Sequence, residues 1–343
     1  MEFALYTSME QLPASAGALF SQGARDSMFL SQQWFENLAN TAVDSITLAC
    51  VEQDGGMLAI LPLMECASNR CYALRHRYTS LYSLLLADGN RQQMLECLLH
   101  GLCKSGYGSL LLEPVAAIDD RLDSLQRCME ASGSNCYRSF RFYNWFHKVA
   151  GQSYTDYMRD RPGRLRNTIT RKSRKLEREH GYSVRLFIGE EVPQAMPDYY
   201  AVYGSSWKAN EQYSDLLDGL ATVFSKEGWS RLGVLYIKGR PAAAQLWFVL
   251  HGKANIFRLA YDETWKRYSP GSLLTSHMME HAIDVDRVEE IDFLVGNETY
   301  KQDWMSERRE RWALSCVRSG KPAGKLERFM GSLKHILKRR RTE

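Results

Sequence analysis

The feature that most constrains the fold is a group of three strand-like segments in the second half of the chain. Residues 229–261 contain these apolar segments, separated only by short glycine-containing turns at residues 238–239 and 251–253. Connections this short close antiparallel hairpins but are too short for the crossover that joins parallel strands. The pattern therefore predicts an antiparallel meander, and the helical spacing of apolar residues over 271–286 predicts a helix after it.

The first half of the chain also mixes helix and strand patterns. Its candidate strands are residues 46–52, 57–64 and 109–113, and its candidate helices are residues 32–40, 92–104 and 119–132. We therefore predict an α/β (α+β) fold with mixed, mostly antiparallel sheets. A length of 343 residues fits two domains, which we place at 1–150 and 151–320, followed by a basic amphipathic helix at 321–343.

Composition excludes several classes of protein. With 45% hydrophobic and 24% charged residues the chain is globular, and no apolar run reaches the roughly 18 to 20 residues of a membrane span. The first fifteen residues lack the basic start of a secretory signal, so we expect a cytoplasmic location. The eight cysteines show no C-x-x-C pair, so we expect buried, reduced thiols and neither a disulfide framework nor a zinc site.

Positive charge is concentrated in two segments of the chain. Residues 159–178 hold nine Lys or Arg against two acids, and residues 320–343 hold eight against two, although the whole chain has a net charge of only +4. Such segments suit a polyanionic partner, either tRNA or an anionic membrane surface at which the protein is peripheral. The alternative is a solvated basic helix. In the first segment, Leu165, Ile169 and Leu176 predict a helix docked on the body of the protein.

A candidate anion site begins the helix after the meander. Ser269 is a suitable N-cap, Pro270 suits the first turn, and Gly271 leaves backbone N–H groups accessible to a phosphate or pyrophosphate. The alternative is an ordinary capped helix. The candidate cofactor-binding residues are Ser269, Gly271, Ser272 and Leu273.

Polar residues follow the next predicted strand, residues 290–295. Asp292 lies in that strand, and Tyr300 and Lys301 follow the turn at residues 296–297. Ligands of open α/β sheets bind at the carboxyl ends of strands. Tyr300 is a candidate proton donor to a leaving group, and Lys301 a candidate ligand of a phosphate or an oxyanion. The alternative for Lys301 is an ordinary surface lysine.

Three further groups of residues are candidates for the same site. Trp207 and Lys208, with Glu211 nearby, are candidates for the mouth of a substrate pocket, together with Asp292. Asp262 and Glu263 are candidate acceptors of a proton from an amine. His277 and His281 share a predicted helix face but do not form the H-E-x-x-H pattern, so we expect no metal there.

At these motifs the sequence resembles the BioF2-like or CelD-like acyltransferases of the GNAT superfamily, which are related to the FemAB peptidyltransferases. The resemblance runs from about residue 34 to residue 317 and rests on residues 164–172, 206–208, 259–263, 269–271 and 296–301, with Trp304 and residues 308–311. It implies tandem GNAT-like domains, of which the C-terminal one keeps the acyl-donor site and the N-terminal one is degenerate and shapes the acceptor cleft.

The resemblance also implies a reaction. An acyltransferase of this kind takes an acyl group from acyl-CoA, such as acetyl-CoA, whose pyrophosphate would lie on the helix that starts at Gly271, and transfers it to an amine. Lys301 matches the position where FemAB-like enzymes place a cation near the reacting ester. By family analogy, the acceptor would be a small molecule, a sugar or a cell-envelope or exopolysaccharide precursor.

Two alternatives to this function stay open. The GNAT phosphate loop R/Q-x-x-G-x-G/A is represented only by Gly271, and FemAB relatives that lack this loop take aminoacyl-tRNA as the donor. The chain would then be a tRNA-dependent aminoacyl or peptidyl transferase. The other alternative is a non-catalytic protein that binds a polysaccharide precursor or a membrane partner.

Overall fold

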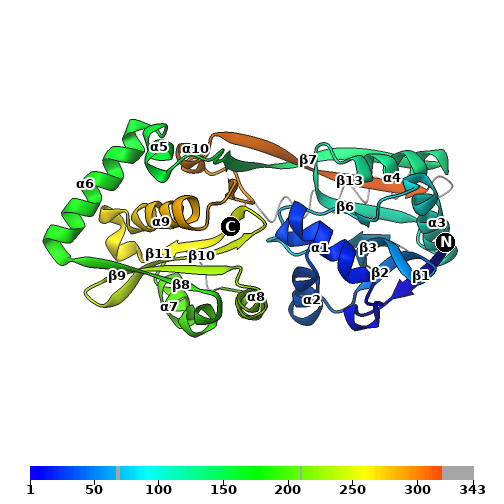
Figure 1. The fold of residues 1–343 in the computed structure, drawn as a ribbon, viewed down its shortest axis with the longest axis horizontal. Coiled ribbons are helices and arrows are strands. Elements are labelled where there is room, and N and C mark those ends of the chain that lie inside the picture. Colours follow the sequence, from blue (N-terminus) through cyan, green and yellow to red (C-terminus); the bar gives the residue numbers. More distant parts are fainter. Residues whose placement is uncertain (67–69, 209–210, 319–343) are drawn as a thin grey trace.

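The computed structural model describes residues 1–66, 70–208 and 211–318 (Figure 1). The predicted helix at 321–343 lies outside these residues. The described strands are β1 (Glu2–Tyr6), β2 (Thr47–Gln53), β3 (Gly56–Cys66), β4 (Arg70–Ala73), β5 (Leu85–Leu86), β6 (Ser109–Ala116), β7 (Ser134–Lys148), β8 (Tyr182–Ile188), β9 (Ser230–Ile237), β10 (Arg240–Leu250), β11 (Lys253–Tyr261), β12 (Glu290–Asp292) and β13 (Glu307–Arg318). The α-helices are α1 (Ala16–Asp26), α2 (Gln32–Thr41), α3 (Arg91–Lys104), α4 (Asp120–Ala131), α5 (Tyr154–Arg159), α6 (Gly163–His180), α7 (Val192–Gly204), α8 (Ser214–Lys226), α9 (Pro270–Glu280) and α10 (Lys301–Trp304).

The strands form one sheet whose order is nearly symmetric about its centre. The order is β1-β2-β3-β4-β6-β13-β7-β12-β11-β10-β9-β8, with β5 beside β3. Each half of the sheet has four antiparallel strands, and a parallel strand follows them, β6 beside β4 and β12 beside β11. The remaining pairs are antiparallel, so the predicted mixed, mostly antiparallel sheet is confirmed.

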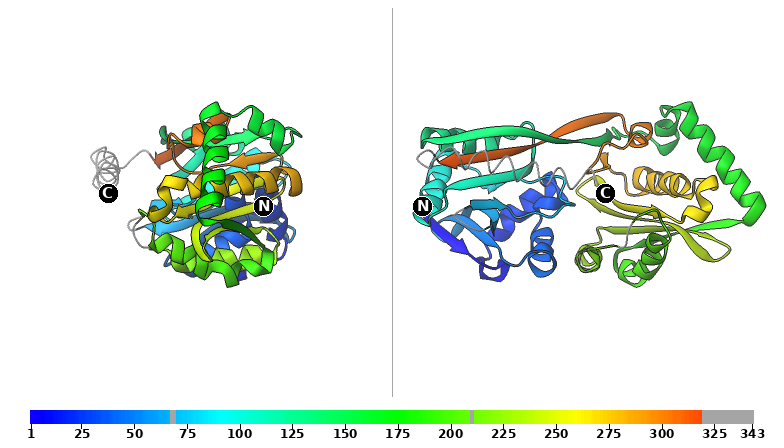
Figure 2. Two further views of the ribbon diagram at one scale, coloured as in Figure 1. Left: turned by 90° about the vertical axis from the view of Figure 1, so that its left-hand side faces the viewer. Right: turned by 180° about the vertical axis from the view of Figure 1, so that it is seen from behind.

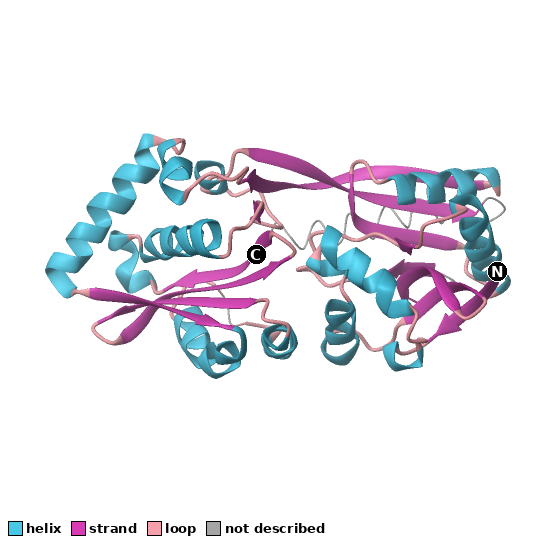
Figure 3. Ribbon diagram, viewed as in Figure 1, coloured by secondary structure: helices cyan, strands magenta, loops and turns pink. Residues whose placement is uncertain are grey.

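The two halves of the sheet exchange their last strands. β7 follows β6 in the chain but pairs with β12, whereas β13 follows β12 but pairs with β6. β7 and β13 also pair with each other over their length and bridge the two halves (Figure 3). The sequence pattern predicted no strand at β7. The predicted domain boundaries stay a prediction.

Helices cover both faces of the sheet and form shared and separate cores. One apolar cluster joins α1 and α2 of the first half to α7 and α8 of the second, with Trp34, Phe35, Leu220 and Phe224 fully buried. A second cluster lies under α3 and α4, and a third under α6 and α9. Helix α6 stands at one end of the molecule (Figure 2), where Leu165 and Leu176 are buried, which confirms the predicted docked helix.

The meander is confirmed as β9, β10 and β11. The helix after it is α9, which continues into one π-helical segment, His281–Val285. His277 is exposed. The buried face of α9 carries Leu273, Leu274 and Met278, and His277 points to solvent between these apolar positions.

The expectation of reduced thiols throughout is wrong for two cysteines. Cys136 of β7 and Cys316 of β13 face each other in register and form a disulfide. The two residues are 180 positions apart in the chain, so only the exchange of β7 and β13 brings them together. Cys50, Cys71 and Cys128 are buried and are not in a disulfide, as predicted.

Candidate active site

The candidate active site is a cavity of about 300 Å³ between two diverging strands. The parallel strands β11 and β12 pair only from Lys253 to Asn255 and from Glu290 to Asp292. Beyond these residues β11 continues to Tyr261, whereas the chain after β12 turns away at Leu294, which has a left-handed φ of 55°. The cavity fills the gap and is lined by residues 256–259 and 293–295, with Arg77, Tyr78, Lys208, Glu298, Tyr300 and Lys301.

Lys301 lies buried at the cavity, only 4% exposed. Its Nζ donates to the carbonyl oxygens of Val295 at 2.6 Å and Phe293 at 3.2 Å, and it lies 2.9 Å from the Glu298 carboxylate. These bonds satisfy the ammonium group inside the protein. Lys301 is therefore not the surface lysine of the alternative interpretation, and its charge is fixed at the opening of the strands.

Tyr300 lines the same cavity and is 43% exposed. Its ring packs edge-on against Phe293, with ring centroids 5.7 Å apart. Partial burial, with the Glu298 carboxylate adding to it, raises the pKa of Tyr300 above its usual value of 10. The phenol therefore stays protonated at neutral pH and is available as a proton donor.

Lys208 reaches the cavity from the opposite side. Its Nζ donates to the carbonyl oxygen of Leu259 at 2.5 Å and lies 5.3 Å from the ring of Trp207. No carboxylate lies within ion-pair distance of this Nζ among the residues that the structure describes. Burial, with the positive charge of Arg258 adding to it, lowers the pKa of Lys208 to about 8. Lys208 and Lys301 therefore bond two ammonium groups to carbonyls of β11 and of the chain after β12.

Glu211 lies behind the cavity and is already bonded there. It accepts a hydrogen bond from the hydroxyl of Tyr78 at 2.9 Å and forms an ion pair with Arg258. The guanidinium of Arg258 also lies 4.4 Å from the centroid of Tyr78. Glu211 thus holds Arg258 and Tyr78 at the cavity wall. The sequence analysis missed Tyr78 and Arg258, although the run of Arg and Tyr at residues 75–78 was a signal.

Asp292 also supports the site from outside the cavity lining. Its Oδ1 accepts hydrogen bonds from the backbone N–H of Leu294 at 2.6 Å and from Nδ2 of Asn144 at 2.5 Å. Its other oxygen forms an ion pair with Arg309. Asn144 also donates to the carbonyl oxygen of Leu294 at 3.0 Å. This cluster holds the backbone of Leu294 in the turn that separates β12 from β11.

Two aromatic rings lie between the start of α9 and Lys208. A Cβ added at Gly271 would lie 3.1 Å from the ring of Tyr261, and this ring is 4.7 Å from that of Trp207. Gly271 and Ser272 are in the first turn, whose N–H groups have no carbonyl partner within the helix. Leu273 is buried, and its N–H donates to the carbonyl of Ser269 at 3.1 Å.

Ser269 takes the predicted N-cap position without making a capping hydrogen bond. Its side chain accepts no hydrogen bond from the helix. The reason is its backbone, because a φ of 53° is left-handed, whereas a capping side chain needs an extended N-cap residue.

Asp262 and Glu263 are outside the cavity lining. Asp262 caps the 3₁₀ helix Glu263–Tyr268 by accepting from the N–H of Thr264 at 2.9 Å. Glu263 forms an exposed ion pair with Lys266 at 3.1 Å. The structure therefore gives both carboxylates local partners. Glu298 is the carboxylate that lines the cavity among the described residues.

Neither a metal cluster nor a membrane-spanning helix is found in the part of the chain that the structure describes. No group of three or more His, Cys, Asp or Glu there is arranged to hold a metal ion. None of the helices in that part is both long and apolar enough to cross a bilayer.

Comparison with known proteins places this cavity in an acetyltransferase domain. A family model described as an acetyltransferase (GNAT) domain matches residues 163–302, which include both diverging strands. No curated protein matches the chain.

Three solved structures share the fold over most of their length. FemX has a TM-score of 0.62 at 10% identity, covering 92% of this chain and 97% of its own. A tandem GNAT protein from the clavulanic acid biosynthesis pathway has a TM-score of 0.55 at 11% identity, covering 94% and 100%. L-PGS from Bacillus licheniformis has a TM-score of 0.53 at 10% identity, covering 81% and 86%.

Proposed function

Because this chain belongs to the GNAT superfamily and is related in fold to FemX and to tandem GNAT proteins, we propose that it is an N-acyltransferase. The donor is acyl-CoA, such as acetyl-CoA, and the acceptor is an amine of a small molecule, a sugar or a cell-envelope or exopolysaccharide precursor. The observation that carries this proposal is the cavity between β11 and the chain after β12, where Lys208, Tyr300 and Lys301 meet.

In this proposal the donor lies across α9 and the cavity. The pyrophosphate binds the free N–H groups of Gly271 and Ser272, where the helix dipole favours an anion. The acyl end then reaches along β11, past Trp207 and Lys208, into the opening between the strands. The thioester carbonyl comes to lie near the ammonium group of Lys301.

The acceptor amine attacks the thioester carbon, so that a C–N bond forms and the C–S bond breaks. Amines are mostly protonated at pH 7, so the attacking amine must first lose a proton. We assign this proton to Glu298, which pairs with Lys301, because it lines the cavity, whereas Asp262 and Glu263 lie outside the lining. Lys301 stabilises the oxyanion, and Tyr300 donates a proton to the departing thiolate.

Donor binding is tested by the thermal midpoint of the purified protein with acetyl-CoA, free CoA and pantetheine. A ligand at about 100 times its Kd adds roughly 2.7 kcal/mol of stability, a shift of several degrees. Ser272→Glu puts a carboxylate where the pyrophosphate would lie, so it should remove the shift with CoA. Gln93→Glu, which adds a carboxylate to the first turn of α3, is the matched control and should keep the shift. Wild type without any shift would contradict an acyl-CoA donor.

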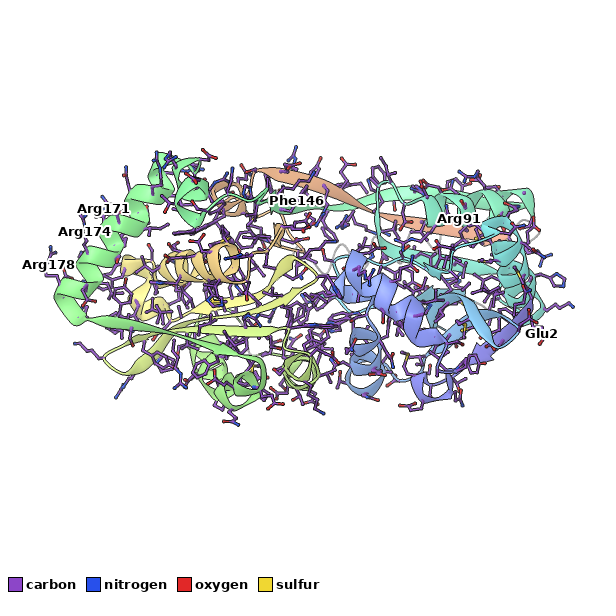
Figure 4. All side chains as sticks on the ribbon, viewed as in Figure 1. Glu2, Arg91, Phe146, Arg171, Arg174 and Arg178 are labelled. Carbon is purple, nitrogen blue, oxygen red and sulfur yellow. A yellow bond between two sulfur atoms is a disulfide. The ribbon has the colours of Figure 1, made fainter. Side chains whose placement is uncertain are left out.

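A second candidate function is an aminoacyl-tRNA-dependent transferase. One observation favours it: α6 carries exposed arginines. Arg171, Arg174 and Arg178 project from its outer side (Figure 4). We expect a tRNA bound there to be lost steeply with salt. Arg→Gln at these three positions should reduce the slope of log K against log salt by about one for each phosphate that the variant no longer neutralises.

The third candidate is a non-catalytic protein that uses a basic face to bind an anionic membrane surface. Turnover separates it from both enzymes, because such a protein would release no product from acyl-CoA or from charged tRNA. The Lys301 variant described in the Discussion supplies that test.

A further inference from the structure

The outer face of the β7–β13 pair carries a row of aromatic side chains that the proposed reaction does not use. Three cross-strand pairs follow one another on this face: Phe140 opposite Trp312, Tyr143 opposite Glu310, and Trp145 opposite Arg308. We call these six residues the aromatic ladder. On the opposite face of this stretch, Asn144 and Arg311 are buried.

The rings of the aromatic ladder contact one another in sequence. Phe140 lies 5.9 Å from Trp312 and 4.9 Å from Tyr143, measured between ring centroids. The guanidinium of Arg308 lies 4.1 Å from the centroid of Tyr143 and 5.7 Å from that of Trp145. The rings therefore form a contiguous row in which Phe140 is tilted by 56° against Tyr143 and by 83° against Trp312, with the guanidinium of Arg308 over Tyr143 and Trp145.

The polar edges of both tryptophans are satisfied within the protein. The indole N–H of Trp312 donates to Glu310 at 2.9 Å, and that of Trp145 donates to Asn297 at 2.7 Å. These bonds fix the orientation of the two rings. Phe140 is 43% exposed and Arg308 is exposed, so ring faces and charged groups remain open to solvent.

The charge of the aromatic ladder argues against a nucleic acid as its partner. Arg308 and Glu310 are its only ionised side chains, and their charges cancel. Binding of RNA or single-stranded DNA needs a net positive surface along the phosphates, in addition to stacking rings. The exposed arginines of α6 lie at the far end of the molecule (Figure 1).

The small area of the aromatic ladder argues against a stable protein partner. Two strands about 4.8 Å apart and five residues long, at roughly 3.3 Å per residue, present about 160 Å². A stable protein interface buries about 800 Å² on each partner. A ligand that fits has flat apolar ring faces, groups at its edges that bond to a guanidinium or a carboxylate, and no net charge.

We infer that the aromatic ladder binds an uncharged oligosaccharide, whose sugar rings lie on Phe140, Tyr143 and Trp312 while their hydroxyls bond to Arg308 and Glu310. Pyranose rings combine C–H faces with hydroxyl edges, which matches this alternation. The ladder ends at Trp145, which is bonded to Asn297 in the same loop that gives Glu298 and Tyr300 to the cavity. A bound chain would thus approach the cavity. The inference itself does not depend on the donor or on the proposed reaction.

The test is a titration of the protein with chitohexaose and with cellohexaose, followed by tryptophan fluorescence and isothermal calorimetry without any donor. We expect saturable binding to at least one of them that Phe140→Ala weakens about tenfold or more. Arg308→Ala, at an exposed residue, is a second variant and should also weaken binding. Tyr137→Ala is the matched control, because Tyr137 is exposed on β7 but pairs with Ser315 on the opposite face, and it should bind like wild type.

Two results would overturn the inference. One is the absence of binding to either hexasaccharide, or binding that both Phe140→Ala and Arg308→Ala leave unchanged. The other is salt-sensitive binding of a six-nucleotide oligouridylate that Phe140→Ala removes, since the ladder would then be a nucleic acid site. Because no donor is present, loss of acyl-CoA binding in the Ser272→Glu experiment would leave this result unaffected.

Discussion

Lys208 shows how the fold changes the chemistry of a single residue. Its ammonium group is bonded to a backbone carbonyl and has no carboxylate within ion-pair distance in the described part of the chain. Burial disfavours the charged form, so the pKa of Lys208 falls to about 8, from an ordinary value near 10.5. Near neutral pH the protein therefore carries a partly desolvated cation beside the cavity.

This shift predicts a dependence of stability on pH. Between about pH 8 and pH 10.5 the unfolded chain binds a proton at Lys208 that the folded chain has lost, so the free energy of unfolding gains a rising contribution from this residue. We expect wild type to become more stable relative to Lys208→Met across this window, and the difference to be constant below it. Urea unfolding of both proteins at pH 7, 8, 9 and 10 measures it. If the free energy of unfolding changed with pH by the same amount in both proteins, the lowered pKa would be contradicted.

Lys301 allows a second prediction about a single residue. Lys301→Ala removes the cation that we propose for the oxyanion, and loss of one such group lowers kcat about 10²- to 10³-fold. Turnover is followed as free thiol released from acetyl-CoA with a panel of amines. Lys266→Ala, at an exposed lysine outside the cavity, is the control and should keep its rate. Equal rates for wild type and Lys301→Ala would remove Lys301 from the mechanism.

The elements that form the site are β12 and the loop that follows it. β12 is only three residues long, and the buried cluster around Asp292 turns the chain at Leu294. This turn separates the two parallel strands and opens the cavity between them. Polar groups at the buried end of a short strand thus determine where the site lies, although they do not line it.

A pair of aspartates tests the importance of this cluster. Asp292→Ala removes the carboxylate that Asn144 and Arg309 share, although Asn144 keeps the carbonyl of Leu294 and Arg309 keeps Glu290. Losing this buried acceptor should lower the free energy of unfolding by about 3 kcal/mol. Asp303→Ala breaks the ion pair with Arg164, whose side chain is 68% exposed. It should change the free energy of unfolding by less than about 1 kcal/mol. Urea unfolding at pH 7 compares the two. Equal losses would show that Asp292 has no special role.

At the scale of the whole molecule, the exchange of β7 and β13 joins the two halves into one structure. β13 lies between β6 and β7, in the half of the sheet that the first 150 residues mostly form. The apolar cluster of α1, α2, α7 and α8 also spans both halves. Neither half completes its own sheet, and the two halves share one of the apolar cores.

We therefore expect the two halves to unfold together. Urea unfolding followed by far-UV circular dichroism and by tryptophan fluorescence should give one coincident transition, with an m-value for the whole chain. Residues 1–150 and 151–343, expressed separately, should be unfolded and should form the native structure only when mixed. Two separate transitions, or a folded isolated half, would contradict this prediction.

The sequence by itself determined the elements whose signal is local. The apolar runs and short turns of residues 229–261 predicted the meander, and helical spacing predicted α9 and the docked face of α6, because these periodicities arise within a few turns of the chain. It also placed Tyr300 and Lys301 after the strand at which the cavity opens. Tertiary structure alone decided which strands are exchanged, that Cys136 and Cys316 are bonded, and that Glu211 and Asp292 support the site from behind. These contacts join residues between about 17 and 180 positions apart, and pairing over such separations leaves no periodic trace in the chain.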